Sequence, residues 1–276
     1  MTPPLDPDSP PVALTIAGSD SGGGAGIQAD LKTMTTHGVF GTSVVTATTA
    51  QNTRGVHDVV PLSAGHVIAQ FDAVVDDLAP EAAKTGMLAT REIVEAVTRK
   101  VREFDGPVVV DPVMVAATGD RLLSSEAEAA YDDLIASATL VTPNADEAAI
   151  LVDGAVETPA DAAAAGRTLV ERGADAALVK GGHLDGDGGV VVDTLVCGTE
   201  GGDPRVRRVE NPRIDSAATH GSGCTLSSAI ASRLARGEPP EDAVVAAVDG
   251  MGEAIRRGYD VGEGPGAVNP TATDAR

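Results

Sequence analysis

Apolar and polar residues follow one another along this chain in blocks that predict strands alternating with helices. Short apolar runs such as Val12–Ala17 and Val108–Val110 are bounded by turn-forming or acidic residues, as is typical of buried strands. Longer segments with helical spacing, such as Arg91–Glu103 and Asp242–Arg256, separate them. Because the strands are continuously apolar, we predict an α/β fold with a mostly parallel sheet and helices on both faces, in three α/β/α layers.

The same patterns predict one domain over residues 12–270. It is preceded by a disordered, acidic and proline-rich tail (1–11) and followed by a flexible tail (271–276). The other expected elements are strands at Phe40–Thr49, Leu140–Thr142, Ala176–Val179, Val190–Val196 and Arg205–Val209, a strand ending at Lys84–Met87, and helices at Ile27–Thr36, Ile68–Leu78, Ser124–Ile135, Asp161–Arg172 and Thr225–Leu234.

Polar residues gather where the predicted strands end. These clusters are Gly18–Asp20, Gln51–Asn52, Asp111, Asn144–Glu147 and Lys180–His183. Ligands of open α/β sheets bind at the carboxyl ends of the strands, so five clusters on this edge predict an active site. The glycines after Val12–Ala17 resemble a dinucleotide fingerprint. NAD binding is nevertheless disfavoured, because the acidic ribose partner is missing after the next strand.

The stretch Asp215–Ser228 leads small residues directly into a helical run. The first amides of a helix lack partners and carry the positive end of its dipole, so Gly221, Ser222 and Gly223 predict an anion site. The same field predicts a lowered pKa for the thiol of Cys224. The alternative is a glycine turn that merely caps a buried helix, with Cys224 packed as a small apolar residue. This stretch taken alone favours the alternative.

Composition adds an unusual charge and few aromatic residues. The chain has 41 acidic and 20 basic residues, a net charge of −21, and 2% aromatic residues. Its surface should therefore repel nucleic acid and anionic membranes, and we expect neither as a partner. Cys197 and Cys224 lack metal-ligand spacing, which disfavours a disulfide scaffold or a structural zinc. With no signal peptide or long apolar run, we expect a cytoplasmic protein.

Seven motifs occur in order along nearly the whole chain, from Ala13 to about Asn269. They are A-G-S-D-S-G-G-G-A-G-I-Q-A-D (17–30), A-Q-N-T-R-G-V (50–56), K-T-G-M-L (84–88), D-P-V-M (111–114), T-P-N-A-D-E (142–147), K-G-G-H (180–183) and H-G-S-G-C-T (220–225). Each is weak alone, but together the set resembles the hydroxymethylpyrimidine and phosphomethylpyrimidine kinases of thiamine biosynthesis, in the ribokinase-like superfamily.

The resemblance implies ATP-dependent phosphorylation of 4-amino-5-hydroxymethyl-2-methylpyrimidine, and then of its monophosphate to the diphosphate. It assigns the pyrimidine ring to Gln51, whose amide has both a donor and an acceptor for an aminopyrimidine edge. Gly18, Ala25 and Asp30 would line the same pocket. Met87 would form an apolar wall, although an ordinary core methionine is a comparable interpretation. The family also implies a homodimer.

For phosphoryl transfer, the resemblance assigns Asp111 and Glu147 to Mg²⁺, directly or through water. Asn144 and Lys180 would face the nucleotide phosphates, with Thr225 on the same nucleotide-binding side. The amides of Gly221, Ser222, Gly223 and Cys224 would form an anion hole for the transferred phosphoryl group. We hypothesise that the Cys224 thiol deprotonates the hydroxymethyl group.

Two other functions remain open from the sequence. One is a pyridoxal or pyridoxine kinase on the same fold, since both substrates are small heteroaromatic alcohols. The other is a non-catalytic pyrimidine- or nucleotide-binding regulator, because Ala117 and Val248 stand where the family often has lysine. His183 and His220 lie beside glycines, and we expect each to bond a backbone carbonyl. Four arginines should form a solvated strand edge: Arg205, Arg207, Arg208 and Arg213.

The acidic composition generates a first prediction, which is adaptation to high salt. Screening by salt removes the repulsion between like charges at the surface, so the melting temperature should rise from about 0.1 to about 3 M KCl. Differential scanning calorimetry over this range measures the effect. A melting temperature that stays flat or falls would contradict the hypothesis, and would make the acidic residues an ordinary solvated surface.

Overall fold

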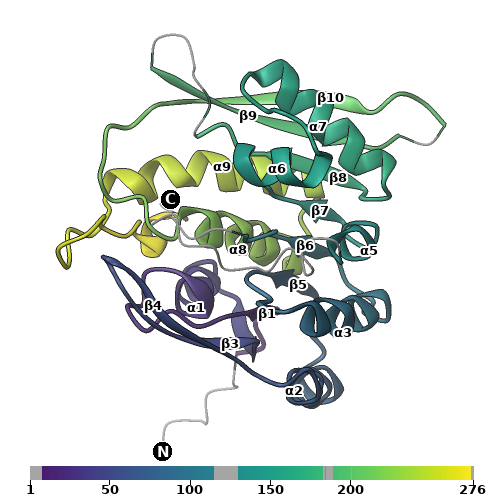
Figure 1. Ribbon diagram of the computed structural model, residues 1–276, viewed down its shortest axis with the longest axis vertical. Coiled ribbons are helices and arrows are strands. Elements are labelled where there is room, and N and C mark those ends of the chain that lie inside the picture. The colour runs from purple at the N-terminus through teal and green to yellow at the C-terminus, as the bar shows by residue number, and fades with distance from the viewer. Residues whose placement is uncertain (1–7, 115–129, 183, 185–188, 200, 275–276) are drawn as a thin grey trace, which may run out of the picture.

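A long twisted sheet runs through the middle of the computed structural model (Figure 1). The structure describes residues 8–114, 130–182, 184, 189–199 and 201–274, and within these the sheet has eight strands in the order β10-β9-β8-β7-β6-β5-β1-β2. The strands are β1 (Val12–Ala17), β2 (Phe40–Val45), β5 (Ala82–Thr85), β6 (Val108–Val110), β7 (Leu140–Val141), β8 (Ala176–Val179), β9 (Val190–Cys197) and β10 (Arg205–Pro212). In the described sheet β9 pairs antiparallel with both β8 and β10, and all other neighbours pair parallel, so the prediction of a mostly parallel sheet is confirmed.

Helices cover both faces of this sheet. Helices α1, α8 and α9 pack on one face, while α2, α3, α5 and α7 pack on the other. Their bounds, with α6 beside α7, are α1 (Gly26–Thr36), α2 (Ala64–Leu78), α3 (Arg91–Arg102), α5 (Tyr131–Ile135), α6 (Ala145–Val152), α7 (Pro159–Glu171), α8 (Ser222–Ala235) and α9 (Pro240–Arg256). Alternate residues of β1 enter the two cores, Leu14 and Ile16 on one face and Ala13 on the other. Burial on both faces explains why the strands are apolar throughout.

The segment after α1 departs from the single strand expected at Phe40–Thr49. It forms β2 and then β3 (Ala47–Asn52), which pairs antiparallel with β4 (Gly55–Pro61) in a separate two-stranded sheet. Thr46 marks the change of sheet, since its amide donates to Ala17 O at 3.0 Å and its hydroxyl donates to Met87 O at 2.6 Å. The β-branched composition correctly predicts strand structure in this segment, but it does not predict that β3 pairs with β4.

Two more local differences concern helices. Helix α6 was not predicted, because its short run Ala145–Val152 directly follows the polar motif. The side chain of Asn144 accepts from the amide of Glu147, and the Glu147 carboxylate accepts from the amide of Asn144, which starts the helix as a capping box. The helix expected at Ser124–Ile135 is described from Tyr131 onward, and its earlier part lies outside the described residues.

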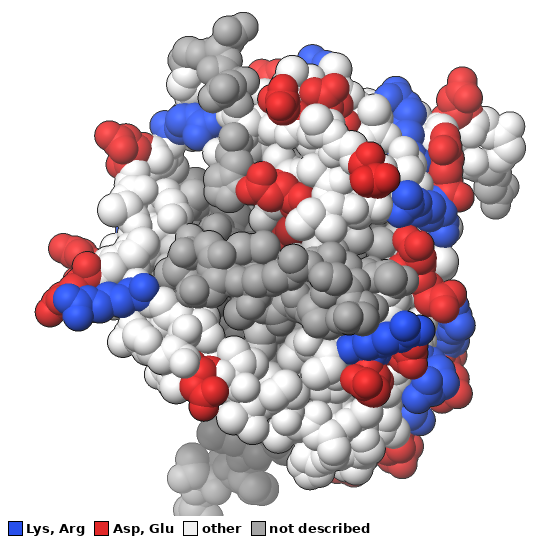
Figure 2. Space-filling model, viewed as in Figure 1, with Lys and Arg blue, Asp and Glu red and all other residues white. Residues whose placement is uncertain are grey.

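The surface carries more acidic side chains than its ion pairs with basic side chains can neutralise. On the face in Figure 2, acidic side chains lie around the margin with basic ones beside several of them. Pairs such as Arg102–Asp133 at 2.8 Å and Arg91–Glu95 at 2.7 Å are exposed, and such pairs each contribute less than about 1 kcal/mol. In the described part of the chain, no helix combines the length and apolar character needed to cross a bilayer.

The C-terminal segment is packed against α1, although a flexible tail was expected from residue 271. Residues Pro270–Ala272 form a 3₁₀ turn, and Ala272 and Thr273 are buried. The Thr273 hydroxyl donates to Pro270 O at 2.8 Å and lies 3.1 Å from Nε2 of His37, the residue after α1. Apolar burial and these two bonds order the segment as far as it is described.

The buried position of His37 generates a prediction about acid stability. Burial, with help from Arg233 and Arg236, lowers the pKa of His37 from 6.5 to about 4. As the pH falls from 6.5 to 4, the unfolded chain therefore takes up a proton that the folded chain refuses, and stability is lost. This loss amounts to about 3 kcal/mol.

Replacing His37→Gln removes this titration. Urea unfolding of both proteins at several pH values should show the variant gaining about 2–3 kcal/mol relative to wild type on acidification. The comparison with wild type cancels the titration of the many carboxylates. A constant difference between the two proteins across this pH range would contradict the assignment.

Candidate active site

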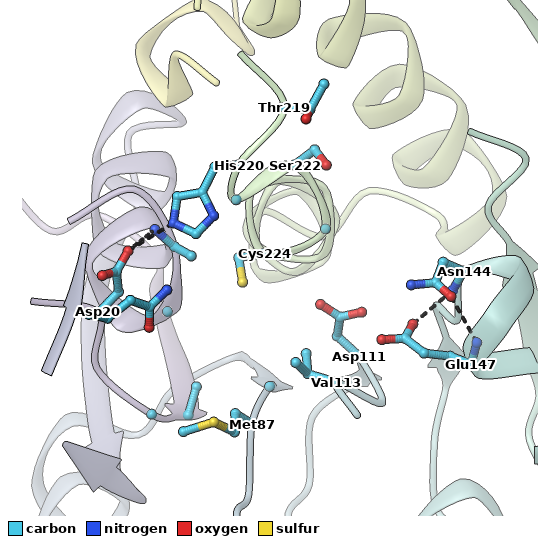
Figure 3. Close-up of a pocket in the computed structure, with 18 of the residues that line it drawn as sticks. Asp20, Met87, Asp111, Val113, Asn144, Glu147, Thr219, His220, Ser222 and Cys224 are labelled. Atoms are coloured by element: carbon cyan, nitrogen blue, oxygen red, sulfur yellow. Dashed lines mark hydrogen bonds and ion pairs between the residues drawn. The ribbon is translucent and has the colours of Figure 1, made fainter. Parts of the chain in front are cut away.

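A cavity of about 650 Å³ lies at the carboxyl ends of the parallel strands, where the sequence predicts the site (Figure 3). This volume suits a small-molecule ligand. Its walls come from the β1–α1 loop, the β3–β4 hairpin, the segments that follow β5 to β8, and the N-terminus of α8. The predicted site residues that line it are Gly18, Ala25, Gln51, Met87, Asp111, Asn144, Glu147, Lys180, Gly221, Ser222, Gly223 and Cys224.

The N-terminus of α8 opens into this cavity without a cap. Gly221 precedes the helix with φ of 78°, in the left-handed region, and a Cβ there would meet Gly24 O at 1.9 Å, so glycine is required. Among the described residues, no side chain caps α8, no acidic residue lies in its first turn, and the amides of Gly223 and Cys224 have no acceptor. These two amides, which the sequence predicts as part of an anion hole, are therefore free to donate to a ligand, whereas the amide of Ser222 donates to Thr219 O at 3.2 Å.

The other glycine-rich loop, between β1 and α1, is closed by its own carboxylate. Asp20 is 2% exposed and accepts from the amides of Gly22, Gly24 and Ala25 at 2.8–2.9 Å. Burial raises its pKa, but the bonds from His220 and from these amides outweigh burial and hold the pKa below its usual value. Because Asp20 occupies these amides, the loop does not offer them to a phosphate.

On the opposite wall, two carboxylates share one lysine. Lys180 Nζ lies 3.0 Å from Asp111 Oδ1 and 4.0 Å from Glu147 Oε2. Burial alone would lower the pKa of Lys180, but the two carboxylates raise it, so the amine is charged. Burial raises the pKa of Glu147 to about 7; Lys180 opposes this shift and Asp111 adds to it.

This donor set fits Mg²⁺ better than a metal held by protein alone. No group of three or more His, Cys, Asp or Glu side chains in the described residues has a metal-binding arrangement. Mg²⁺ commonly uses one or two carboxylates together with water and substrate phosphates. Asp111 and Glu147 supply two carboxylates beside the anion hole, and a cation there would relieve the repulsion between them.

The β3–β4 hairpin borders the end of the cavity next to the β1–α1 loop. The hydroxyl of Ser21 donates to Gln51 O at 2.7 Å and accepts from Gln51 N at 2.8 Å, at a bulge in β3. Gln51 therefore reaches the cavity from the small sheet and not from the end of a central strand. Met87 is 8% exposed and lines the cavity, in agreement with the apolar wall that the resemblance implies.

Two predicted site residues do not line the cavity. Asp30 is fully buried, with both carboxylate oxygens 3.0–3.1 Å from Lys84 Nζ and further bonds from the hydroxyls of Thr15 and Ser228. The carboxylate faces the core because the buried lysine requires an anion. Thr225 is also fully buried in α8, one residue beyond the bare amides.

The pKa of Cys224 is the opposite of the predicted one. Burial raises it to about 12, and the carboxylates of Asp30 and Asp111 add to this effect. Lys84 and the amide of Gly26 lower it, but by less. Although the sulfur lies at a helix N-terminus and lines the cavity, the thiol therefore keeps its proton in the free protein.

Two basic residues, His220 and Arg213, differ from the sequence-based expectations. His220 bonds the carboxylate of Asp20 through Nε2 at 3.1 Å, instead of a backbone carbonyl. Arg213 is not merely solvated, since its guanidinium donates to the carbonyls of Gly182 and Leu184 at 3.0 Å. His183 lies outside the described residues. The motif G-S-D-S contained Asp20, but only the fold brings it to a histidine 200 positions later.

The structure describes one of the two positions at which the family often has lysine. Val248 is a residue of α9. It is 3% exposed, packs in the core and does not line the cavity. Its replacement of a lysine therefore removes no charge from the cavity wall. Ala117 lies outside the described residues.

Comparisons with known proteins agree with this geometry. The profile of the phosphomethylpyrimidine kinase family matches residues 20–269. A hydroxymethylpyrimidine/phosphomethylpyrimidine kinase of Streptomyces coelicolor is 47% identical over 270 residues, 98% of this chain and 97% of that protein. A thiamine biosynthesis bifunctional protein of Geobacter sulfurreducens is 45% identical over 93% of this chain and 51% of that protein. The structure of a Staphylococcus aureus pyridoxal kinase in complex with AMP-PCP and pyridoxal has a TM-score of 0.87 at 31% identity, covering 97% of this chain and 96% of that one.

Fold and site together define a ribokinase-like phosphotransferase that uses ATP. Within this class, the chain belongs to the phosphomethylpyrimidine kinase family. Its reaction is the phosphorylation of hydroxymethylpyrimidine and phosphomethylpyrimidine in thiamine biosynthesis. The family and function implied by the seven sequence motifs are thereby confirmed.

The raised pKa of Cys224 generates a prediction about thiol reactivity. In a Cys197→Ser background, the rate of alkylation by iodoacetamide should rise continuously from about pH 7 to about pH 10, because the thiolate is the reacting form. An ordinary thiol, with a pKa of 9.0, would begin to level off in this range. Mass spectrometry of the labelled protein measures the rate, and Cys224→Ser in the same background gives the blank. A plateau below pH 9 would show that the helix dipole overcomes burial after all.

Proposed function

We propose that the cavity holds the pyrimidine next to the β1–α1 loop and the nucleotide next to β7 and β8, with the N-terminus of α8 between them. One observation carries this proposal: the bare amides of Gly223 and Cys224 share a cavity with Asp111, Lys180 and Gln51. Asp111 lies to one side of Cys224, and Asp20, in the loop that bonds Gln51 through Ser21, lies to the other (Figure 3). Phosphoryl transfer requires positioning and charge neutralisation more than covalent chemistry. The arrangement supports both.

On the nucleotide side, the lysine would bind phosphate and the carboxylates would bind the metal ion. Lys180 would contact phosphate oxygens, because it is charged and held by Asp111 at 3.0 Å. Asn144 lines the same wall, with its side-chain oxygen committed to the Glu147 amide. Asp111 and Glu147 would hold Mg²⁺, which when bound neutralises phosphate charge. The amides of Gly223 and Cys224 would receive the charge that develops on the transferred group, whereas the amide of Ser222 donates to Thr219 O at 3.2 Å.

On the acceptor side, the hairpin would fix the ring. Both backbone polar atoms of Gln51 are bonded to Ser21, so the backbone that carries its side-chain amide is fixed beside the cavity. That amide would pair with the aminopyrimidine edge. Gly18, Ala25 and Met87 line the same end and would enclose the apolar faces of the ring.

Cys224 can act as a base only if the pKa of its thiol is lowered. A thiol with a pKa of about 12 gives its proton to water very rarely, so this role requires the pKa to fall when substrates bind. Lys84 and the Gly26 amide are the neighbours that favour the thiolate. If the pKa does not fall, we infer that Cys224 contributes only its amide to the anion hole. The acceptor hydroxyl would then lose its proton without help from the thiol as phosphoryl transfer proceeds.

A pyridoxal kinase is the second candidate, since the fold superimposes on one with a TM-score of 0.87. The sequence relatives favour the pyrimidine instead, at 47% identity over nearly the full chain. A non-catalytic regulator is less well supported, because Asp111, Glu147, Lys180 and the anion hole converge and Val248 takes no charge from the cavity. The homodimer that the resemblance implies remains a prediction, which light scattering of the purified chain would test.

The test is ATP consumption by the purified protein in about 1 M KCl, with hydroxymethylpyrimidine, its monophosphate and pyridoxal offered in parallel. We expect turnover of both pyrimidines, little turnover of pyridoxal, and none when Mg²⁺ is chelated. Gln51→Leu should lower kcat/KM for the pyrimidine by about 10–100-fold, because a ring amine would lose its polar partner, while the KM for ATP stays unchanged.

Other results of this assay would favour one of the alternative functions or remove a proposed role. Turnover of pyridoxal alone would keep the phosphate site and overturn the acceptor assignment. Tight binding of a pyrimidine with no ATP consumption on any acceptor would favour the regulator. Full activity after chelation would remove the roles of Asp111 and Glu147 in holding Mg²⁺.

A further inference from the structure

The two glycine loops that face the cavity are fitted into each other. Gly24 of the β1–α1 loop lies against the anion-hole loop so closely that a Cβ on it would meet His220 Cδ2 at 2.5 Å. In the reverse direction, Gly24 O occupies the position that a Cβ on Gly221 would require. The helices that follow these loops, α1 and α8, pack side by side on one face of the sheet. The loops therefore meet as a close-packed pair.

A charged hydrogen bond joins the two loops at this contact (Figure 3). Asp20 Oδ2 accepts from the amides of Gly24 and Ala25 and lies 3.1 Å from His220 Nε2. Because the carboxylate is ionised and accepts from each neighbour, the histidine carries its hydrogen on Nε2. Asp20 is 2% exposed and the His220 side chain is 12% exposed, so water competes little for the bond.

The histidine is also fixed from behind by the C-terminal segment. Its amide donates to Gly266 O at 3.0 Å, and its carbonyl accepts from the amide of Val268 at 3.0 Å. The backbone of His220 is therefore held on both sides, one residue before the anion hole begins. Any displacement of the β1–α1 loop relative to α8 must break either the Asp20 bond or this backbone pairing.

We propose that Asp20 and His220 act together as positioning residues that set the distance between the acceptor and the transferred phosphoryl group. This inference rests on the proposed function, in which the β1–α1 loop holds the acceptor and the amides of α8 hold the phosphoryl group. The two groups sit on separate loops, so their separation depends on how the loops are joined. An error of about 1 Å in such a separation costs about 100-fold in rate.

The geometry distinguishes positioning from proton transfer. Nε2 of His220 is committed to a carboxylate that lies in the β1–α1 loop, and Asp20 itself is surrounded by four donors. Neither group presents a proton acceptor on these atoms to a substrate hydroxyl. What the pair offers is a fixed link, which a side-chain amide of similar reach would also supply.

The experiment compares His220→Ala, His220→Gln and Asp20→Asn with wild type in steady-state kinetics on hydroxymethylpyrimidine and ATP. We expect His220→Ala and Asp20→Asn each to lower kcat by about 10–100-fold, with the KM for ATP within about threefold of wild type. His220→Gln keeps an N–H donor and should recover kcat to within about threefold. The double variant Asp20→Asn/His220→Ala should be no slower than the slower single variant.

His37→Ala is the matched control. It removes another buried histidine that does not line the cavity, so it should lower the melting temperature without lowering kcat. Wild-type kcat in His220→Ala would overturn the proposal. Inactivity of His220→Gln equal to that of His220→Ala would also overturn it, because only the imidazole would then suffice. Additive losses in the double variant would show that the two residues act separately, against the proposal.

A second readout keeps this test independent of the acceptor assignment. Failure of the proposed function would appear as wild-type protein that does not phosphorylate the pyrimidine. In that case, hydrogen exchange of the amides in residues 219–226 still reports the link. Exchange should be faster in His220→Ala than in wild type and near wild type in His220→Gln. Equal exchange in all three proteins would overturn the link itself.

Discussion

The carboxyl edge of the sheet depends on a difference between the two glycine-rich loops that lead into the neighbouring helices α1 and α8. Every helix begins with amides that need acceptors. In the loop before α1, Asp20 accepts from the amides of Gly22, Gly24 and Ala25, and the amide of Ile27 in the first turn of the helix donates to Gly18 O at 3.0 Å. At α8 the amides of Gly223 and Cys224 have no such acceptor among the described residues, so they remain available. Two glycine-rich loops of similar composition thus differ: the amides of one are bound by its own carboxylate, whereas two amides after the other are free to donate to an anion.

Buried charge is the second constraint, and it is balanced within the site. Lys84 and Asp30 neutralise each other in the core beneath Cys224, with no exposure of either side chain. Lys180 serves two carboxylates, so the wall with Asp111 and Glu147 carries one negative charge more than its lysine cancels when both are ionised. Burial, with a smaller contribution from Asp111, raises the pKa of Glu147 to about 7, and a bound cation would favour its ionised form. This charge balance supports the proposal that the site takes a ligand that brings both a metal ion and phosphates.

Much of this was readable in the sequence, and the errors share one physical cause. Val108–Val110 followed by Asp111 predicts a buried strand with a carboxylate at the catalytic edge, because both facts are local. Gln51 was placed in the cavity for a wrong reason, since its strand pairs with β4 and not with the central sheet. The pKa of Cys224 was predicted from its helix position alone, whereas burial and carboxylates distant in sequence decide it. Asp30 likewise finds its partner Lys84 at 54 positions along the chain. Local patterns predict elements and their ends, while long-range partners set charge and burial.

The four lysines of this acidic chain show what such a composition preserves. Lys84 and Lys180 are held in the charge network of the site, and Lys32 donates to the carbonyl of Gly23 in the β1–α1 loop at 2.7 Å. Lys100 pairs with Asp72 at 2.8 Å and lies over the ring of Phe71. Each amine that remains thus has a partner that fixes its position. Three of these four amines, those of Lys32, Lys84 and Lys180, support the cavity or the loop beside it, so in a chain with so few lysines their positions point to the part of the fold where charge is most needed.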